Sequence, residues 1–495
     1  MERATSEEPL AYRAVRGGLW VALSAYWTLA FGFVANILLT RMLAPEAFGT
    51  FALAMFFAQL FRIQTKLRLG YAFGQHPETT GESLGTYAVL EGAAALGGLV
   101  LMGMMVPVLR ALGYGEQVVM AALVLSFAAF LEGIASIAGT LLEKGLRFGA
   151  TSLYQSLVFP LSYLPAFWLA LHGGGVWSLV AQTTVYSFLL LGLLVIARQG
   201  MPHLWKARWG FRRDLALSFL RFGGAAGLWL MAGTLFAQLD NFLIGTFVGV
   251  TVLGYYDRAY RIAQWPALVF NAVLARTVFY TYARLQGDRE RLEKMMTMIT
   301  WAIGMIASPL ALAILLTARE IVLLLYGERW LPSVVFLQIL IAFFVVRPHL
   351  EHAGVLLNAT GKPGRAAVLQ WIQVGVLGIA GVPLTLQWGA LGTCGAVGLA
   401  LAIGWVLAWF FLRRDVQLDG LQALELWRMA VVLLTAVLLV LLLSDLLEPF
   451  SLDAWASAVL KFVGVFICFY AVMLAIDPST MRERMMYLWT WARKR

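Results

Sequence analysis

Apolar runs long enough to form helices of about 20 residues recur along almost the whole chain, and they restrict the possible folds more than any other feature. A helix of that length spans the hydrocarbon core of a bilayer. Because lipid offers the backbone no hydrogen bonds, only helices and closed barrels can cross it. We therefore predict an all-α, polytopic integral membrane protein with about 14 transmembrane helices. The expected spans lie near residues 18–40, 48–70, 84–108, 118–141, 149–171, 176–197, 217–248, 254–276, 296–317, 331–358, 366–387, 390–412, 427–446 and 456–476.

Charge supports this class and indicates the orientation. Charged residues make up 13% of the chain, against about 25% in soluble proteins. The formal net charge of +10 comes mostly from Lys and Arg in alternate connections between the expected spans, which is typical of cytoplasmic loops. We therefore expect both termini in the cytoplasm and no nucleic acid as a partner. Cys394 and Cys468 lie in apolar runs, so we expect them to pack as small apolar side chains without a disulfide.

A faint internal repeat divides the chain into similar parts. The shift of 205 residues that aligns Asn36–Gly49 with Asn241–Gly254 also aligns three single positions: Ala54 with Ala259, Ala58 with Ala263 and Gln59 with Gln264. Because an even number of expected spans separates the copies, they would be parallel repeats about an axis along the membrane normal. The expected organisation is a six-helix N-lobe at 1–198, a cytoplasmic link at 199–216, a six-helix C-lobe at 217–412, two extra helices at 413–476 and a basic amphipathic tail at 477–495.

Five short segments carry a resemblance to a known family: Arg41–Gly49, Gly173–Val180, Asp240–Ala259, Leu325–Trp330 and Leu357–Lys362. Together they resemble the polysaccharide-transport (Wzx-like) branch of the multidrug/oligosaccharidyl-lipid/polysaccharide (MOP) flippase superfamily. The resemblance implies two lobes around a central cavity and transport of a polyprenyl-diphosphate-linked saccharide across the inner (cytoplasmic) membrane, for cell-surface polysaccharide biosynthesis. The expected partners are this lipid-linked saccharide and the membrane lipids, and the chain itself is expected to be a monomer.

A diphosphate headgroup calls for cationic side chains at membrane depth. Guanidinium groups suit it best, because they stay charged and donate hydrogen bonds in a fork. The expected substrate-binding residues are Gln59, Arg62, Lys66, Arg258, Arg261 and Arg347. Gln59, Arg62 and Lys66 would share one face of the second helix, at positions i, i+3 and i+7. The alternative is that this helix ends early and leaves Arg62 and Lys66 solvated; within the bilayer, Arg62 would need water, the substrate or an acid such as Glu132.

Acidic residues at the same depth suggest ion coupling or simple neutralisation. Asp240, Asp257 and Glu351 are the candidates for binding a monovalent cation or a proton. Asp257 with Arg261, and Arg347 with Glu351, stand four residues apart on a helix, and the alternative for each pair is mutual neutralisation. Asp240 has no basic residue three or four positions away. Asp240 is therefore the preferred ion-coupling residue.

Two further features of the tenth expected helix concern its shape and its histidines. Pro348 is expected to kink the helix. His349 and His352 have no partner Cys or His at metal-ligand spacing, so polar lining or packing is favoured over a metal site.

The motifs that the sequence lacks reduce the number of possible energy sources for transport. The chain has no Gly-x-x-x-x-Gly-Lys-Ser/Thr loop, so we expect neither ATP hydrolysis nor a cofactor. The membrane potential would suffice, since it is worth about 2.3 kcal/mol per charge per 100 mV. Two other classes stay open: a cation-coupled multidrug antiporter of the same superfamily, and a membrane glycosyltransferase or polymerase. The second would normally show a large outer loop with catalytic residues, and the expected spans leave no room for one.

Overall fold

The computed structural model describes residues 10–63, 67–202, 204, 209–415, 453–476, 478, 481–484 and 486, and all secondary structure in these residues is helical. The chain divides into two compact units, unit 1 (Met1–Gly254) and unit 2 (Tyr255–Arg495). The expected span at 427–446, Lys66 and most of the expected tail lie outside the described residues.

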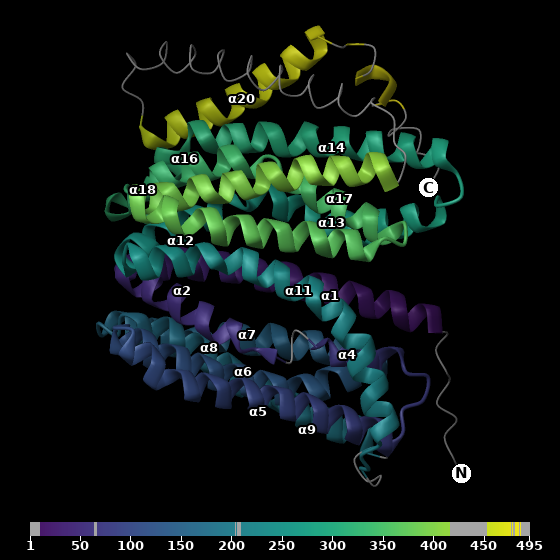
Figure 1. Cartoon of the computed structure of the whole chain (residues 1–495). Coiled ribbons are helices and arrows are strands. Elements are labelled where there is room, and N and C mark those ends of the chain that lie inside the picture. The colour runs from purple at the N-terminus through teal and green to yellow at the C-terminus, as the bar shows by residue number, and fades with distance from the viewer. Residues whose placement is uncertain are drawn as a thin grey trace. The chain divides into compact units, whose positions relative to one another are not determined.

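Unit 1 is a bundle of long helices that lie side by side (Figure 1). Packing joins α5 to α6, α7 to α8 and α1 to α7. The helices are α1 (Leu10–Met42), α2 (Pro45–Leu60), α4 (Leu69–Gln75), α5 (Gly81–Ala111), α6 (Glu116–Lys144), α7 (Phe148–Leu171), α8 (Val176–Leu190), α9 (Gly192–Gly200) and α11 (Arg213–Phe247).

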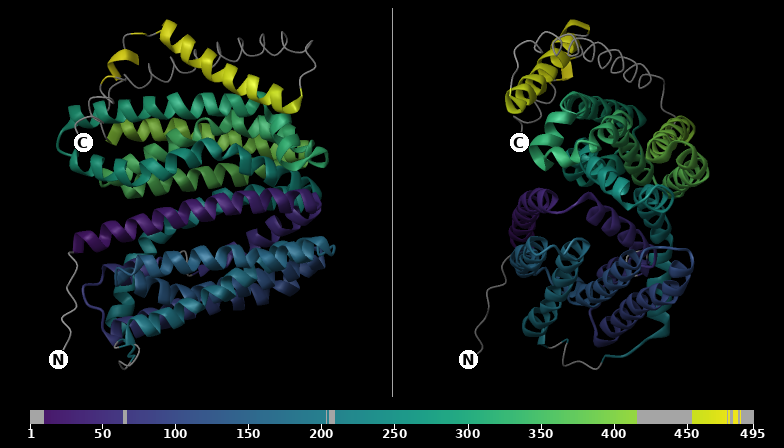
Figure 2. Two further views of the ribbon diagram at one scale, coloured as in Figure 1. Left: turned by 180° about the vertical axis from the view of Figure 1, so that it is seen from behind. Right: turned by 90° about the vertical axis from the view of Figure 1, so that its left-hand side faces the viewer.

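Unit 2 is a second helical bundle, which the right-hand view of Figure 2 shows nearly end-on. In it α17 packs against α13 and α18, and α20 lies along α14. The helix α12 (Val250–Ala263) begins in unit 1 and ends in unit 2. The others are α13 (Trp265–Arg284), α14 (Arg289–Leu316), α15 (Ala318–Tyr326), the 3-10 turn η1 (Glu328–Trp330), α16 (Ser333–Phe344), α17 (Arg347–Ala359), α18 (Pro363–Asp415) and α20 (Ala454–Ile476).

Eight helical segments of the described residues are long and apolar enough to cross a membrane, which supports the predicted class. They are Gly17–Met42, Gly81–Ala111, Glu116–Lys144, Val176–Gly200, Arg289–Leu316, Ser333–Ala359, Pro363–Arg414 and Ala454–Ile476. The segment Pro363–Arg414 covers two expected spans, and Gly389 interrupts it with a left-handed backbone at φ 59°. The kink expected at Pro348 is confirmed as a break between α16 and α17. Both cysteines are free thiols.

The expected second span, 48–70, is wrong in its last third. The helix α2 ends at Leu60, and Arg68 then has a left-handed backbone at φ 45° before α4 begins. Gly98 of α5 lies against this end of α2, where an added Cβ would stand 2.4 Å from the carbonyl oxygen of Phe61. The backbone of the turn therefore rests directly on α5. Gln59 and Arg62 do not share one continuous helical face, because Arg62 lies beyond the end of α2.

Two glycines of the repeated segment meet the backbone of the opposite copy. A Cβ added to Gly49 would stand 1.6 Å from the carbonyl oxygen of Val250, and one added to Gly254 would stand 1.9 Å from that of Pro45. The shift of 205 residues converts Gly49 into Gly254 and Pro45 into Val250. The two contacts are therefore reciprocal, which is the property of a contact across a two-fold axis.

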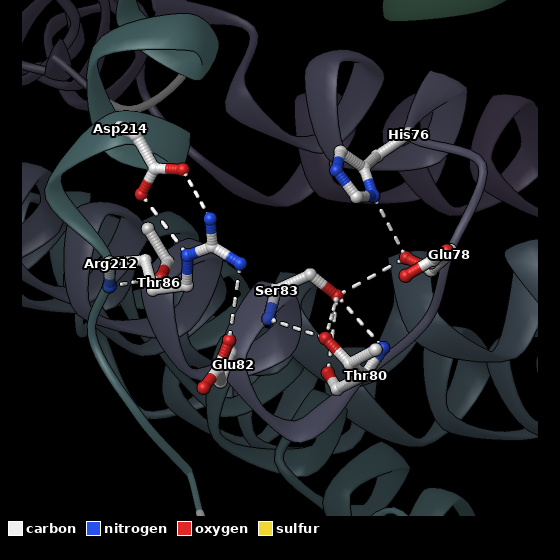
Figure 3. A network of polar contacts seen from close by, with 8 residues as sticks. All are labelled: His76, Glu78, Thr80, Glu82, Ser83, Thr86, Arg212 and Asp214. Atoms are coloured by element: carbon white, nitrogen blue, oxygen red, sulfur yellow. Dashed lines mark hydrogen bonds and ion pairs between the residues drawn. The ribbon is translucent and has the colours of Figure 1, made fainter.

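A polar network fixes the start of α5 to the chain that leads into α11 (Figure 3). Thr80 and Ser83 form a reciprocal capping box at the start of α5. The backbone N–H of Arg212 donates to Thr86 Oγ1 at 2.9 Å, and its guanidinium pairs with Glu82 and Asp214. The hydrogen bond from Arg212 lowers the pKa of the Asp214 carboxyl below its usual value. The end of the expected inter-lobe link is thus held at the first turn of α5.

Candidate functional site

The site in unit 1 is built around an ion pair between distant parts of the chain. Arg62, in the turn after α2, donates through Nη2 to Glu132 Oε2 on α6. The other carboxylate oxygen of Glu132 accepts a hydrogen bond of 2.9 Å from Ser187 Oγ on α8. Both charged side chains are 22% exposed. Of the environments expected for Arg62, the structure therefore shows the pairing with Glu132.

A second acid, Glu91 of α5, lies in the same bundle. Glu91 is 5% exposed, and Ser136 Oγ lies 3.1 Å from its Oε1. The Ser136 hydroxyl also lies 2.7 Å from the carbonyl oxygen of Gly133, and a single O–H can serve only one of these acceptors well. Unit 1 therefore holds Arg62 in a bundle with two carboxyl groups, Glu91 and Glu132.

Gln59 faces α11 across a small cavity. This cavity of about 10 Å³ is lined by Phe56, Gln59 and Leu60 of α2 and by Met231, Thr234, Leu235 and Gln238 of α11. The amides of Gln59 and Gln238 both border it, so this space has polar groups on two helices. Asp240 lies two residues further along α11 and is 1% exposed, with its Oδ1 accepting from the backbone N–H of Asn241 at 2.8 Å.

In unit 2, the cations on α12 converge on Asp257. Arg258 and Arg261 both bond to Asp257 Oδ2, at 2.5 and 3.1 Å. The Arg258 side chain is 2% exposed, whereas that of Arg261 is 48% exposed. The pairing expected between Asp257 and Arg261 is thus observed, and Arg258 joins it.

The pairing expected on the tenth span is observed as well. Arg347 Nε lies 3.1 Å from Glu351 Oε1, one turn further along α17. Arg347 also donates through Nη1 to the hydroxyl of Tyr260 on α12 at 3.1 Å and stands 5.1 Å from the ring centre of Phe344. Tyr260 thus connects the charged residues of α12 with those of α17.

Sequence reasoning did not find the hydroxyl partners Ser136, Ser187 and Tyr260. Serine in a membrane helix usually bonds to its own backbone, and Ser187 does donate to the carbonyl of Thr183 at 2.9 Å. Of the three, Tyr260 alone could have been found from the sequence, because it lies one residue before Arg261 in the charged segment. Among the described candidates, the structure joins Asp257, Arg258 and Arg261 in one cluster and Arg347 and Glu351 in another, while Arg62, Gln59 and Asp240 lie in unit 1.

The fold defines the class of protein. Over 92% of its length the chain is similar to a solved structure of the lipid II flippase MurJ in an inward closed conformation, with a TM-score of 0.73 and 12% sequence identity, and 99% of that chain is covered. With the apolar helices of both units, this similarity shows an all-α, multi-pass membrane protein with the fold of that transporter.

Residues 38–335 match the family described as "Polysaccharide biosynthesis protein". The chain belongs to this family, in agreement with the resemblance to the Wzx-like branch that its sequence segments carry. It is 26% identical over 322 residues to the succinoglycan biosynthesis transport protein ExoT of Rhizobium meliloti (strain 1021), covering 63% of this chain and 62% of that protein, which is less than two thirds of its length. It is 22% identical over 376 residues to the teichuronic acid biosynthesis protein TuaB of Bacillus subtilis (strain 168), covering 74% of this chain and 75% of that protein.

Proposed function

We propose that this chain is a flippase that carries a polyprenyl-diphosphate-linked oligosaccharide across the cytoplasmic membrane by alternating access, for the assembly of a cell-surface polysaccharide. The observation that carries the proposal is the ion pair of Arg62 and Glu132 inside an apolar bundle. A charge in such surroundings is costly and is usually retained for function. Family membership supports the same substrate class.

The geometry of the pair suits an exchange of partners. A diphosphate offers Arg62 the same fork of hydrogen bonds as a carboxylate, with more charge. Ser187 Oγ would remain within hydrogen-bond distance of Glu132 when Arg62 leaves, so one polar neighbour stays with the carboxylate. Arg62 is therefore the proposed first contact of the diphosphate, with Lys66 as its neighbour. Gln59, Arg258, Arg261 and Arg347 are the further proposed contacts along the path.

For the architecture we propose about 14 membrane helices, since roughly 20 apolar residues make one span. Residues 1–198 and 217–412 would form parallel six-helix lobes joined by the link at 199–216, with 413–476 outside them. The reciprocal contacts of Gly49 and Gly254 support this arrangement, because parallel repeats related by a two-fold axis would make them. Both termini, including the tail at 477–495, would face the cytoplasm, and the chain would act as a monomer.

The energy would come from the membrane potential, with or without a coupled ion. A headgroup with two negative charges that leaves a negative interior gains roughly 4 to 5 kcal/mol per 100 mV. Of the proposed coupling acids, Asp257 and Glu351 are bonded to arginines. Asp240 is the first choice as the residue that binds a monovalent cation or a proton, because it is 1% exposed in an apolar helix, where a carboxyl group is usually functional.

A reconstituted system tests the proposal. The purified chain is placed in liposomes with a polyprenyl-diphosphate oligosaccharide that carries a fluorescent sugar, and headgroup exposure is followed with a membrane-impermeant quencher. We expect protein-dependent translocation that accelerates when the compartment entered by the headgroup is made positive. In Asp240→Asn, the response to a cation gradient should fall while translocation driven by the electrical potential persists. The proposal is wrong if translocation with folded wild-type protein equals that in empty liposomes.

A further inference from the structure

Unit 2 encloses a cavity whose residues have no part in the function proposed above. It has a volume of about 40 Å³ and lies among α14, α17 and α18. Two imidazoles and two indoles border it: His349, His352, Trp405 and Trp409. Thr300 adds a hydroxyl. Since one water molecule needs about 10–15 Å³ of such space, the cavity has room for water.

The two histidines occupy one face of α17 and differ in their bonding. His352 Nε2 lies 2.6 Å from the hydroxyl of Tyr282 on α13, and both side chains are buried. His349 Nδ1 is buried without a hydrogen-bond partner among the residues that the structure describes. A buried polar atom without a partner costs about 1–3 kcal/mol. This cost is offset if the atom receives a proton or a hydrogen bond in another state of the protein.

We propose that His349, His352 and Tyr282 form a proton-binding site in unit 2. A hydronium ion in the water of the cavity transfers its proton to one imidazole ring nitrogen: one O–H bond breaks, one N–H bond forms and a neutral water molecule remains. The two imidazoles stand one turn apart, so a charge on one disfavours a charge on the other, and the pair takes up one proton. Trp405 and Trp409 border the same cavity as the two imidazoles, so a proton bound there lies near two indole rings.

The other charged groups near α17 are already engaged. Arg347 and Glu351, on the same helix, pair with each other, and Arg347 bonds to Tyr260. From α18, Arg413 stands 4.7 Å from the ring centre of Trp409. From α13, the group that meets the histidines is the Tyr282 hydroxyl, while the cavity wall from α14 consists of Met296 and Thr300. A proton on the histidine pair would add one positive charge to a region in which Glu351 and Arg347 offset each other and Arg413 is a further cation.

The role of this proton in transport rests on the function proposed above, whereas proton binding itself does not. Proton uptake would make unit 2 sensitive to pH, and its release on the other side of the membrane would couple export to a proton gradient.

The tryptophans that border the cavity provide the test, because a protonated imidazole quenches the fluorescence of a nearby indole. Fluorescence of the purified full chain in lipid nanodiscs is titrated from pH 8 to pH 4.5. His172 is a built-in comparison, since it is exposed and its ring lies 4.6 Å from that of Trp168. We expect one component of the quenching to disappear in His172→Gln and a different one in His349→Gln/His352→Gln.

Two further variants keep the test decisive if the double histidine variant does not fold. Trp405→Phe/Trp409→Phe should remove the same component as the histidine substitutions while leaving the site intact. Tyr282→Phe should move the midpoint of that component by about half to one pH unit, the equivalent of one hydrogen bond. The proposal is overturned if the folded histidine variant, or the tryptophan variant, titrates like the wild type. Because no saccharide is present, this result is independent of the transport assay.

Discussion

At the scale of single residues, the observed ion pairs differ in how readily the arginine could leave its carboxylate partner to bind a substrate. Arg258 is bonded to the neighbouring Asp257, and its side chain is 2% exposed, so a substrate could not reach it without a rearrangement of the bundle. Arg62 and Glu132 are 70 residues apart in the chain and half-buried, and Glu132 has Ser187 as a second partner. Of these two arginines, Arg62 is therefore the one best suited to transfer to a substrate.

The first prediction concerns Arg62. Arg62→Ala should lower saccharide export roughly 10- to 100-fold, since a charge-assisted hydrogen bond is worth about 1.5–3 kcal/mol. Arg62→Lys keeps the charge without the fork and should be impaired less. Export is measured in cells at matched membrane abundance. Arg110→Ala is the matched control, because Arg110 also pairs with a glutamate, Glu116, but on an exposed surface.

The partner substitution distinguishes binding from mere neutralisation. If Arg62 only neutralises Glu132, then Glu132→Gln and Arg62→Ala should be equally harmful, and the double variant no worse than either. If Arg62 binds the diphosphate, Glu132→Gln should retain much more export than Arg62→Ala. Normal export by Arg62→Ala would remove this residue from the proposed site.

At the scale of elements, the sequence predicts where helices exist better than where they stop. Apolar length alone indicates a membrane span, because the bilayer sets that length. The end of α2 at Leu60 has no such local signal, since it coincides with the approach of Gly98 on a distant helix. Helical spacing likewise predicts the pair of Arg347 and Glu351, one turn apart. The bond between Arg62 and Glu132 depends on the tertiary fold, so from the sequence Glu132 was only one of several possible partners for Arg62.

The second prediction concerns the two reciprocal glycine contacts. Gly49→Ala and Gly254→Ala should each lower the melting temperature by several degrees or prevent accumulation, because a methyl group would overlap a backbone carbonyl. Gly103→Ala is the control, since its Cβ would meet no atom within 4 Å, and alanine is the better helix former. Thermal unfolding is followed by size exclusion of the detergent-solubilised protein. A Gly49→Ala variant as stable as Gly103→Ala would show that α2 is not packed this closely.

At the scale of the whole molecule, the distribution of positive charge predicts which side each connection faces. Gly115, before α6, is expected outside, and Gly287, before α14, inside. Both have room for a side chain, since a Cβ there would meet no atom within 4 Å. In a background without Cys394 and Cys468, a membrane-impermeant maleimide added to intact spheroplasts should label Gly115→Cys and spare Gly287→Cys. The opposite labelling would reverse the topology, and equal labelling would contradict the span count.

The function at this scale followed from combined signals rather than from any one of them. The five motif segments are individually degenerate, but together they indicate the family that residues 38–335 match. The sugar that is carried has no such signature, because ring hydroxyls can be bound by many arrangements of common polar side chains. The charges at membrane depth could be named from the sequence, whereas their hydroxyl partners, such as Tyr260, could not.

The contact between α2 and the start of α12 has a mechanical consequence. At Gly49 and Gly254 two backbones touch with no side chains between them, so one can pivot on the other without any rotamer having to change. The helix α2 could therefore tilt as a rigid body about this contact. From Gly49 to Leu60 the helix is about 16 Å long, at 1.5 Å per residue. A tilt of about 10° would move its tip by about 3 Å, which is enough to separate a donor from its acceptor, and Arg62 is attached just beyond that tip.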